Sequence, residues 1–135
     1  MKKNIFLVAI VGFLFFIGCN QNKKPDLSDP VSSGRGFIES SLKGDYDAAK
    51  DYILPDSLNL NYLDRLREFY KKMPSSEKEG LKNANIIINP TENINDSEVV
   101  INYSNTYKHI PSKIKMLRKN SEWRVDFKYT FSGNL

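Results

Sequence analysis

The sequence predicts an α+β fold in which N-terminal helices pack on an antiparallel sheet of about four strands. Up to Pro74 the apolar residues recur every three or four positions, as in amphipathic helices, and from Ala84 they alternate with polar residues, as in strands. Helices followed by a meander of half-polar strands are typical of α+β layers. The 135 residues, 40% of them hydrophobic, contain no apparent repeat. We therefore expect one globular domain over residues 30–135.

Three helices are expected before the sheet. The first begins at Asp29-Pro30, an N-cap residue followed by proline at the first helical position, and ends at Gly44 in a left-handed conformation. Gly34 and Gly36 are weak helix formers in its first turns. Asp45 can cap a second short helix that Pro55 ends. The apolar positions of the third helix, which Pro74 stops, are Leu63, Leu66, Tyr70 and Met73.

The polar stretch 75–83 separates these helices from the expected strands. Strands are predicted around residues 84–89, 99–104, 113–116 and 123–131. Asn120-Ser121 can form a tight hairpin turn, because asparagine tolerates positive φ. The last strand alternates from Trp123 to Phe131, which places Arg124 and Asp126 on the outer face of the sheet.

The N-terminus predicts a bacterial lipoprotein signal over residues 1–18. Lys2 and Lys3 precede residues 5–17, which contain neither a charge nor a strong hydrogen-bonding side chain, and these thirteen residues are too few to span a bilayer. The segment 16–19, Phe-Ile-Gly-Cys, resembles a lipobox, which implies that Cys19 is lipidated and becomes the first mature residue. An ordinary cleaved signal peptide and an uncleaved anchor are the alternatives. Residues 19–29 then form the lipidated cysteine and a polar tether that Pro25 keeps from being helical.

The expected location is the bacterial cell envelope, with a lipid anchor. Asn20 after the cysteine favours the outer membrane, with the domain facing the periplasm. Without residues 1–18 the chain has 18 basic and 16 acidic side chains, and the basic residues are interspersed with acids. We therefore expect the membrane as a partner through Cys19, and no nucleic acid.

Two segments support a family resemblance. Residues 37–52 (FIESSLKGDYDAAKDY) and residues 114–126 (IKMLRKNSEWRVD) resemble the opening and the ending of small bacterial lipoproteins of unknown function with a lumazine-binding-like, nuclear transport factor 2-like (cystatin-like) domain. The resemblance covers about residues 30–131. It implies a curved antiparallel sheet wrapped around helices, which forms a cone with a candidate pocket at its open end.

Aromatic residues are the candidates for lining such a pocket, and core packing is the alternative for all of them. The candidates are Tyr52, Tyr62, Tyr70, Tyr103 and Trp123. A further candidate is Ser57, because Asp56-Ser57-Leu58 resembles an O-glycosylation signal of some periplasmic systems.

Catalytic and metal-binding motifs are absent from the sequence. We find no Gly-rich phosphate loop, no Ser-His-Asp set and no metal-ligand spacing, so we expect no cofactor and no metal. The single histidine, His109, is expected in a surface loop at a strand entry.

The resulting expectation is a non-enzymatic binding or accessory domain of the envelope. Its ligand would be a small apolar molecule, or its partner an envelope protein on the open sheet face. One alternative is a small isomerase or hydrolase, which needs an ionisable side chain inside the pocket. Another is a structural envelope protein that forms a homodimer through its sheet.

Overall fold

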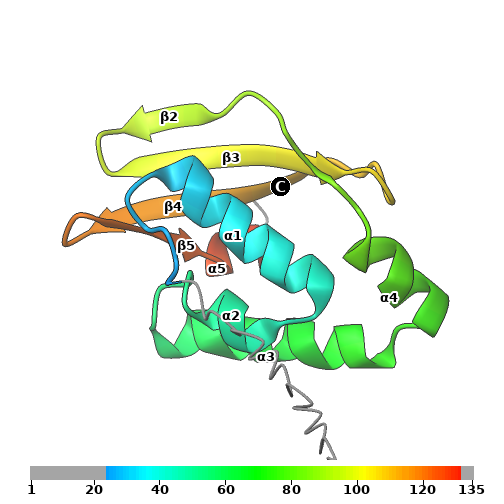
Figure 1. Ribbon diagram of the computed structural model, residues 1–135. Helices are drawn as coiled ribbons and strands as arrows, with labels where there is room; N and C mark the ends of the chain where they lie inside the picture. The colour runs from blue at the N-terminus through cyan, green and yellow to red at the C-terminus, as the bar shows by residue number, and fades with distance from the viewer. Residues whose placement is uncertain (1–23, 132–135) are drawn as a thin grey trace, which may run out of the picture.

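The computed structural model describes residues 24–131, in which four helices precede the strands (Figure 1). The elements are α1 (Pro30–Lys43), α2 (Tyr46–Lys50), α3 (Ser57–Lys72), α4 (Ser75–Lys82), β1 (Ile86–Ile88), β2 (Glu92–Asn95), β3 (Glu98–Asn105), β4 (Ser112–Lys119), β5 (Glu122–Asp126) and α5 (Lys128–Phe131). Helices packed on an antiparallel sheet confirm the predicted α+β class. The arrangement is compatible with a nuclear transport factor 2-like fold.

The described residues form a five-stranded antiparallel sheet around β3 and β4. Its order is β1-β3-β4-β5, and β2 also pairs with β3. Ile86–Ile88 pair with the end of β3, and Glu92 and Asn93 pair with its beginning, so two short strands share one edge of β3. Asn120 and Ser121 join β4 to β5 with φ values of 50° and 64°. Two successive positive φ values fit a two-residue hairpin turn and confirm the predicted turn.

The outer edge of β5 is covered by two segments from the N-terminal half. The Val125 N–H donates to the carbonyl of Tyr52 at 2.8 Å, and the Leu54 N–H donates to the carbonyl of Val125 at 3.0 Å. The Trp123 N–H donates to the carbonyl of Leu27 at 2.8 Å. The edge is thus paired, and the last part of the segment predicted as a tether is fixed to the sheet.

Side-chain caps fix the starts of the helices, as the sequence predicts. Asp29 accepts a hydrogen bond from the Ser32 N–H at 2.8 Å, with Pro30 in the first helical turn, and Asp45 accepts one from the Ala48 N–H at 3.0 Å. Gly44 ends α1 at φ 75°, and its position also touches Tyr70, whose ring lies 2.4 Å from where a Cβ would be. Both the turn and the packing of α3 on it therefore require glycine.

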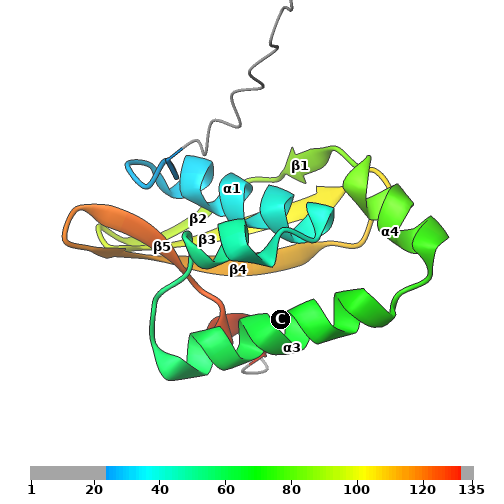
Figure 2. The same ribbon diagram turned by 60° about the horizontal axis from the view of Figure 1, so that its bottom comes forward.

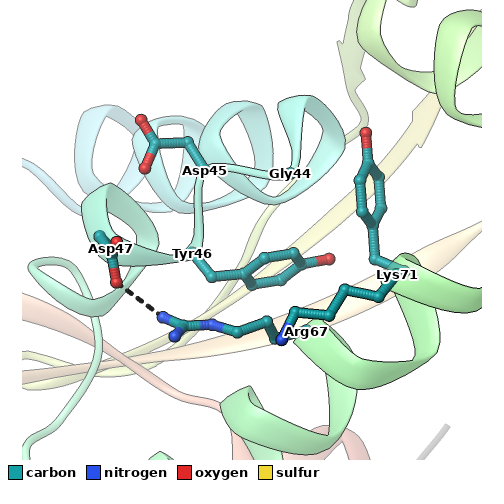
Figure 3. A pocket seen from close by; sticks show the side chains of 7 residues that line it. Gly44, Asp45, Tyr46, Asp47, Arg67 and Lys71 are labelled. Carbon is teal, nitrogen blue, oxygen red and sulfur yellow. Dashed lines mark hydrogen bonds and ion pairs between the residues drawn. The ribbon is translucent and has the colours of Figure 1, made fainter.

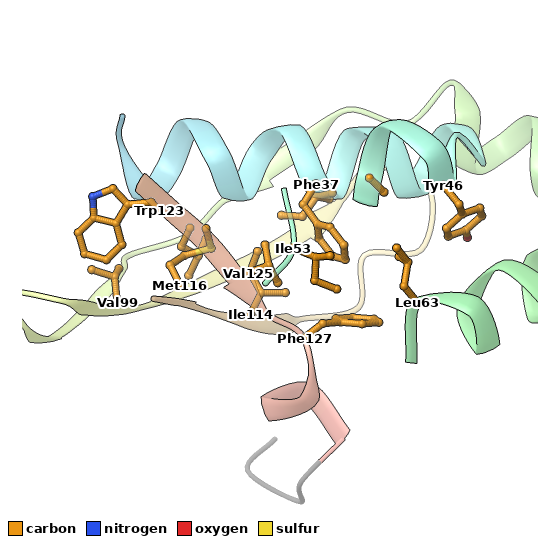
Figure 4. Close-up of a cluster of buried hydrophobic side chains, with 13 residues drawn as sticks. Phe37, Tyr46, Ile53, Leu63, Val99, Ile114, Met116, Trp123, Val125 and Phe127 are labelled. Atoms are coloured by element: carbon orange, nitrogen blue, oxygen red, sulfur yellow. The ribbon is translucent and has the colours of Figure 1, made fainter. Parts of the chain in front are cut away.

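The core lies between α1 and the inner face of β3, β4 and β5, and α2 and α3 close one end of it (Figures 2 and 4). Alternate strand positions point inward, which gives the expected period of two. The buried cluster contains Phe37, Ile38, Tyr46, Ala49, Ile53, Leu63, Val99, Ile101, Ile114, Met116, Trp123, Val125 and Phe127.

Helix α1 approaches the sheet closely because it presents small residues to it. The Ser33 hydroxyl donates to the carbonyl of Trp123 at 2.7 Å, and a Cβ on Gly34 would lie 2.6 Å from Cδ1 of Ile101. A Cβ on Gly36 would lie 2.4 Å from the ring of Tyr52. A side chain at Gly34 would displace the fully buried Ile101, and one at Gly36 would displace the half-buried ring of Tyr52.

Three parts of the fold differ from the sequence prediction. Residues 75–82 form α4 although only Leu81 is buried there, because so short a helix has too few apolar positions for a helical pattern. Strand β2 was not predicted, because all four of its residues are exposed. The last strand ends at Asp126 instead of Phe131, because the Lys128 N–H turns to the side chain of Asn59 and the chain continues as α5.

We predict that Gly34→Ala lowers the free energy of unfolding, because the added methyl group overpacks the contact with Ile101 at a cost of about 1–3 kcal/mol. The gain of about 1 kcal/mol in helix propensity offsets part of this cost, so the net loss we expect is up to about 2 kcal/mol. Chemical denaturation measures it. Arg35→Ala, at an exposed position of the same helix, is the control and should change the stability by less than about 0.5 kcal/mol. A Gly34→Ala variant as stable as the parent would contradict the close packing.

Candidate functional site

The five aromatic residues predicted to line a pocket lie in different places. Trp123 is 8% exposed and belongs to the core cluster, and the four tyrosines pack half-buried against it. Tyr62 and Tyr70 border two separate hollows on either side of α3. The ring of Tyr52 lies against Gly36, and Tyr103 pairs with Ile88 and Ser112 in the sheet. Burial raises the pKa of both Tyr52 and Tyr103.

The first hollow lies between α3 and α5 and has a volume of about 290 Å³. We call it the α3–α5 hollow. Leu58, 48% exposed, lies at its rim. The remaining residues that line it are Tyr62, Asp126, Lys128 and Tyr129. Its walls are therefore an aliphatic side chain and two aromatic rings, with one ion pair between them.

A buried amide organises the polar side of the α3–α5 hollow. Asn59 is fully buried, and its amide nitrogen donates to Asp56 at 2.7 Å and to Asp126 at 3.3 Å. Its amide oxygen accepts from the Lys128 N–H at 2.8 Å. Asn59 thereby ties the start of α3 to the point where β5 becomes α5.

The charged groups around Asn59 are paired with one another. The Lys128 ammonium lies 3.1 Å from Asp126 and 3.4 Å from Asp56. Burial lowers the pKa of Lys128, but the hydrogen bonds and charges of Asp126 and Asp56 outweigh it and raise that pKa. The pKa of Asp56 is lowered, chiefly because its carboxylate accepts the Asn59 N–H at the start of α3.

The position of the Asp126 side chain differs from the one that the sequence predicts. Strand alternation placed it outside, but it is 8% exposed and borders the α3–α5 hollow. Strand β5 ends at Asp126. Asn59 and Lys128 cover its outer face there, and they therefore bury the carboxylate. Arg124 keeps its outward position and donates to the carbonyl of Asp51 at 2.8 Å.

The second hollow, about 270 Å³, lies between α3 and the turn that joins α1 to α2 (Figure 3). We call it the α2–α3 cleft. Seven residues line it, namely Gly44, Asp45, Tyr46, Asp47, Arg67, Tyr70 and Lys71. The rings of Tyr46 and Tyr70 meet edge to face with centroids 5.8 Å apart. Burial, and then the neighbouring Tyr70, raise the pKa of Tyr46.

Two of the remaining predicted positions, His109 and Ser57, are exposed at the surface. His109 lies in the exposed loop before β4, as predicted, with φ 55° and its N–H donating to the carbonyl of Asn105 at 2.9 Å. Ser57 is the exposed first residue of α3. Cys19 and the predicted signal segment 1–18 lie outside the described residues.

Two searches of the described residues give negative results. No helix within residues 24–131 is long and apolar enough to cross a membrane. In the same range, no three His, Cys, Asp or Glu side chains are grouped so that they could hold a metal ion.

Comparison with known proteins gives no relative from which a role could be transferred. No protein-family model matches the chain. The curated proteins likewise contain no match to it. A functional argument therefore has to start from the hollows of the described residues, among them the two beside α3 described above.

We predict that Asn59→Ala lowers the free energy of unfolding by about 1–3 kcal/mol, because it leaves the buried Asp126 without its amide donor and the Lys128 N–H without its acceptor. Chemical denaturation of the variant tests this. Asn61→Ala, at an exposed position of the same helix, is the matched control and should be near-neutral. Equal stability of the two variants would remove the structural role given to Asn59.

Proposed function

We propose that this protein is a membrane-anchored lipoprotein of the bacterial envelope whose nuclear transport factor 2-like, lumazine-binding-like domain binds a small apolar or aromatic ligand without catalysing a reaction. The single observation that supports ligand binding is the α3–α5 hollow. Leu58, Tyr62 and Tyr129 line it together with the ion pair between Asp126 and Lys128. The anchor rests on the lipobox-like segment that ends at Cys19.

The chemistry of the hollow favours a ligand with a flat apolar body and one polar group. When a ligand covers the aliphatic and aromatic walls, the free energy of binding becomes more favourable by about 25 cal/mol per Å² of apolar surface removed from water. The ion pair on the polar side offers both a donor and an acceptor that can orient the ligand. The volume of about 290 Å³ is at the lower end of small-molecule sites, which suits a ligand of one or two rings.

The outer face of the sheet carries charged residues, which do not favour self-association through this face. Glu98 pairs with Lys115 at 3.2 Å, and Glu92 pairs with Lys113 at 3.3 Å. Sheet faces that form stable dimers are more apolar than this charged surface. A ligand site therefore has better support than a homodimer.

The anchor would hold the domain close to the bilayer. Leu27 is hydrogen-bonded to β5, so the chain between Cys19 and Leu27 spans at most about 28 Å when fully extended.

The enzymatic alternative has one observation in its favour, the buried carboxylate of Asp126 beside the hollow. Both Asn59 and Lys128 contact this carboxylate. A general base has to be within reach of the proton that it removes and exchange it readily. The contacts of Asp126 with the fold support a structural role more than proton transfer.

For the anchor, we predict that denaturing mass spectrometry of protein extracted from its own membranes gives a chain that begins at Cys19 and carries acyl chains. Cys19→Ser should lose the acyl mass and leave the membrane fraction, because the thiol is the attachment point. A Cys19→Ser protein that still carries fatty acid would contradict the lipidation site.

For the ligand site, we predict that 1-anilinonaphthalene-8-sulfonate binds with a rise in fluorescence and that Leu58→Glu weakens this binding at least fivefold. The new carboxylate would stand at the rim of the hollow and repel the sulfonate. Phe69→Glu is the matched control, because Phe69 is 62% exposed on the same helix and is not among the residues that line the hollow. Equal effects of both substitutions, or no binding to the parent, would overturn the assignment.

A further inference from the structure

The α2–α3 cleft carries two cations on one wall. Arg67 and Lys71 are four residues apart on α3, so they lie on the same side of the helix, and both line the cleft. A third cation, Lys78, lies 5.8 Å from the centre of the Tyr70 ring, and its ammonium donates to the carbonyl of Lys71 at 2.8 Å. Two positive charges therefore line the cleft, and a third lies beside one of its aromatic rings.

The acidic residues near these cations hold them weakly. Arg67 pairs with Asp47 at 2.8 Å, but the Asp47 side chain is 92% exposed. Lys71 pairs with Glu68 at 2.7 Å, and both side chains are more than half exposed. Exposed pairs of this kind contribute about 0–1 kcal/mol, so a ligand with an anionic group can replace them.

The remaining acid of the cleft, Asp45, is used elsewhere. Its carboxylate accepts the N–H of Ala48 at 3.0 Å as the cap of α2. In Figure 3 this carboxylate points away from the Tyr46 ring and from Arg67, whereas Arg67 runs beneath the ring to Asp47. Asp45 therefore leaves the cations of the opposite wall available.

Arg67 also has an unused hydrogen-bond donor. Its Nε is buried and has no partner among residues 24–131, while one terminal nitrogen donates to Asp47. Guanidinium groups bind oxyanions best through two parallel N–H groups, and the single bond to Asp47 uses only one. A buried donor without an acceptor costs about 1–3 kcal/mol, a cost that an incoming oxyanion would remove.

We infer that the α2–α3 cleft is a second binding site, which takes the oxyanion group of a small ligand, a carboxylate or a phosphate. Arg67 turns from Asp47 to bind two oxygens of the anion with Nε and a terminal nitrogen, and Lys71 supplies a second charge. The Tyr46 and Tyr70 rings form the apolar wall against which the rest of the ligand packs. The volume of about 270 Å³ has room for such a group with a single ring attached.

The test uses the full chain in detergent micelles and two probes. Benzoate binding is followed by saturation-transfer-difference NMR, and inorganic phosphate binding by the width of its ³¹P line. We expect at least one probe to bind and Arg67→Gln to weaken that binding at least tenfold. Binding of benzoate alone would assign a carboxylate ligand, and binding of phosphate alone would assign a phosphate or phosphate ester.

A matched control is present on the same helix. Arg65 lies over the Tyr62 ring at 5.6 Å and does not line the cleft, so Arg65→Gln should leave probe binding unchanged. Lys71→Gln should weaken probe binding severalfold. If circular dichroism shows that the Arg67→Gln protein is unfolded, Lys71→Gln serves as the test variant in its place. Failure of both probes to bind the parent, or equal binding by parent, Arg67→Gln and Lys71→Gln, would overturn the inference. Neither result would affect the α3–α5 hollow, which Leu58→Glu tests separately.

Discussion

The fully buried side chain of Asn59 is the contact on which the arrangement around α3 depends. Its amide nitrogen donates to the carboxylates of Asp56 and Asp126, and its amide oxygen accepts from the Lys128 N–H. Because Asn59 belongs to α3 and its partners belong to the end of β5 and the start of α5, one side chain fixes three elements relative to one another. The walls of the α3–α5 hollow are set by this connection.

The second constraint is the close contact between α1 and the sheet. Ser33 and Gly34 have small side chains, which allow the helix backbone to come near Trp123 and Ile101. The core is then filled from both sides by large apolar residues. The two hollows lie at the surface beside α3, where its packing against α2 and α5 leaves side chains apart.

Local signals in the sequence predict much of this fold. The caps Asp29 and Asp45, the left-handed Gly44 and the Asn120-Ser121 turn all act through neighbouring backbone atoms, so they can be read without tertiary information. The alternating period of β4 is equally clear, because Ile114 and Met116 on one of its faces are buried.

The parts that the sequence could not predict depend on contacts between distant residues. The end of β5 is decided by Asn59, 69 residues before Lys128, and nothing in residues 123–131 shows it. Strand β2 has no buried face and therefore no pattern. The pairing of Arg67 with Asp47 depends on how α2 meets α3, so the α2–α3 cleft had no signal beyond its tyrosines.

The hydrogen bond between Leu27 and Trp123 has a mechanical consequence for an anchored chain. Tension applied to the N-terminus by a moving membrane or a distant attachment would reach the domain first at this bond and then at the Asp29 cap. Both contacts adjoin the place where α1 lies against β5, joined by the hydrogen bond from Ser33 to Trp123. In an anchored chain the load would therefore enter at the starts of α1 and β5, away from the Arg67 side of α3.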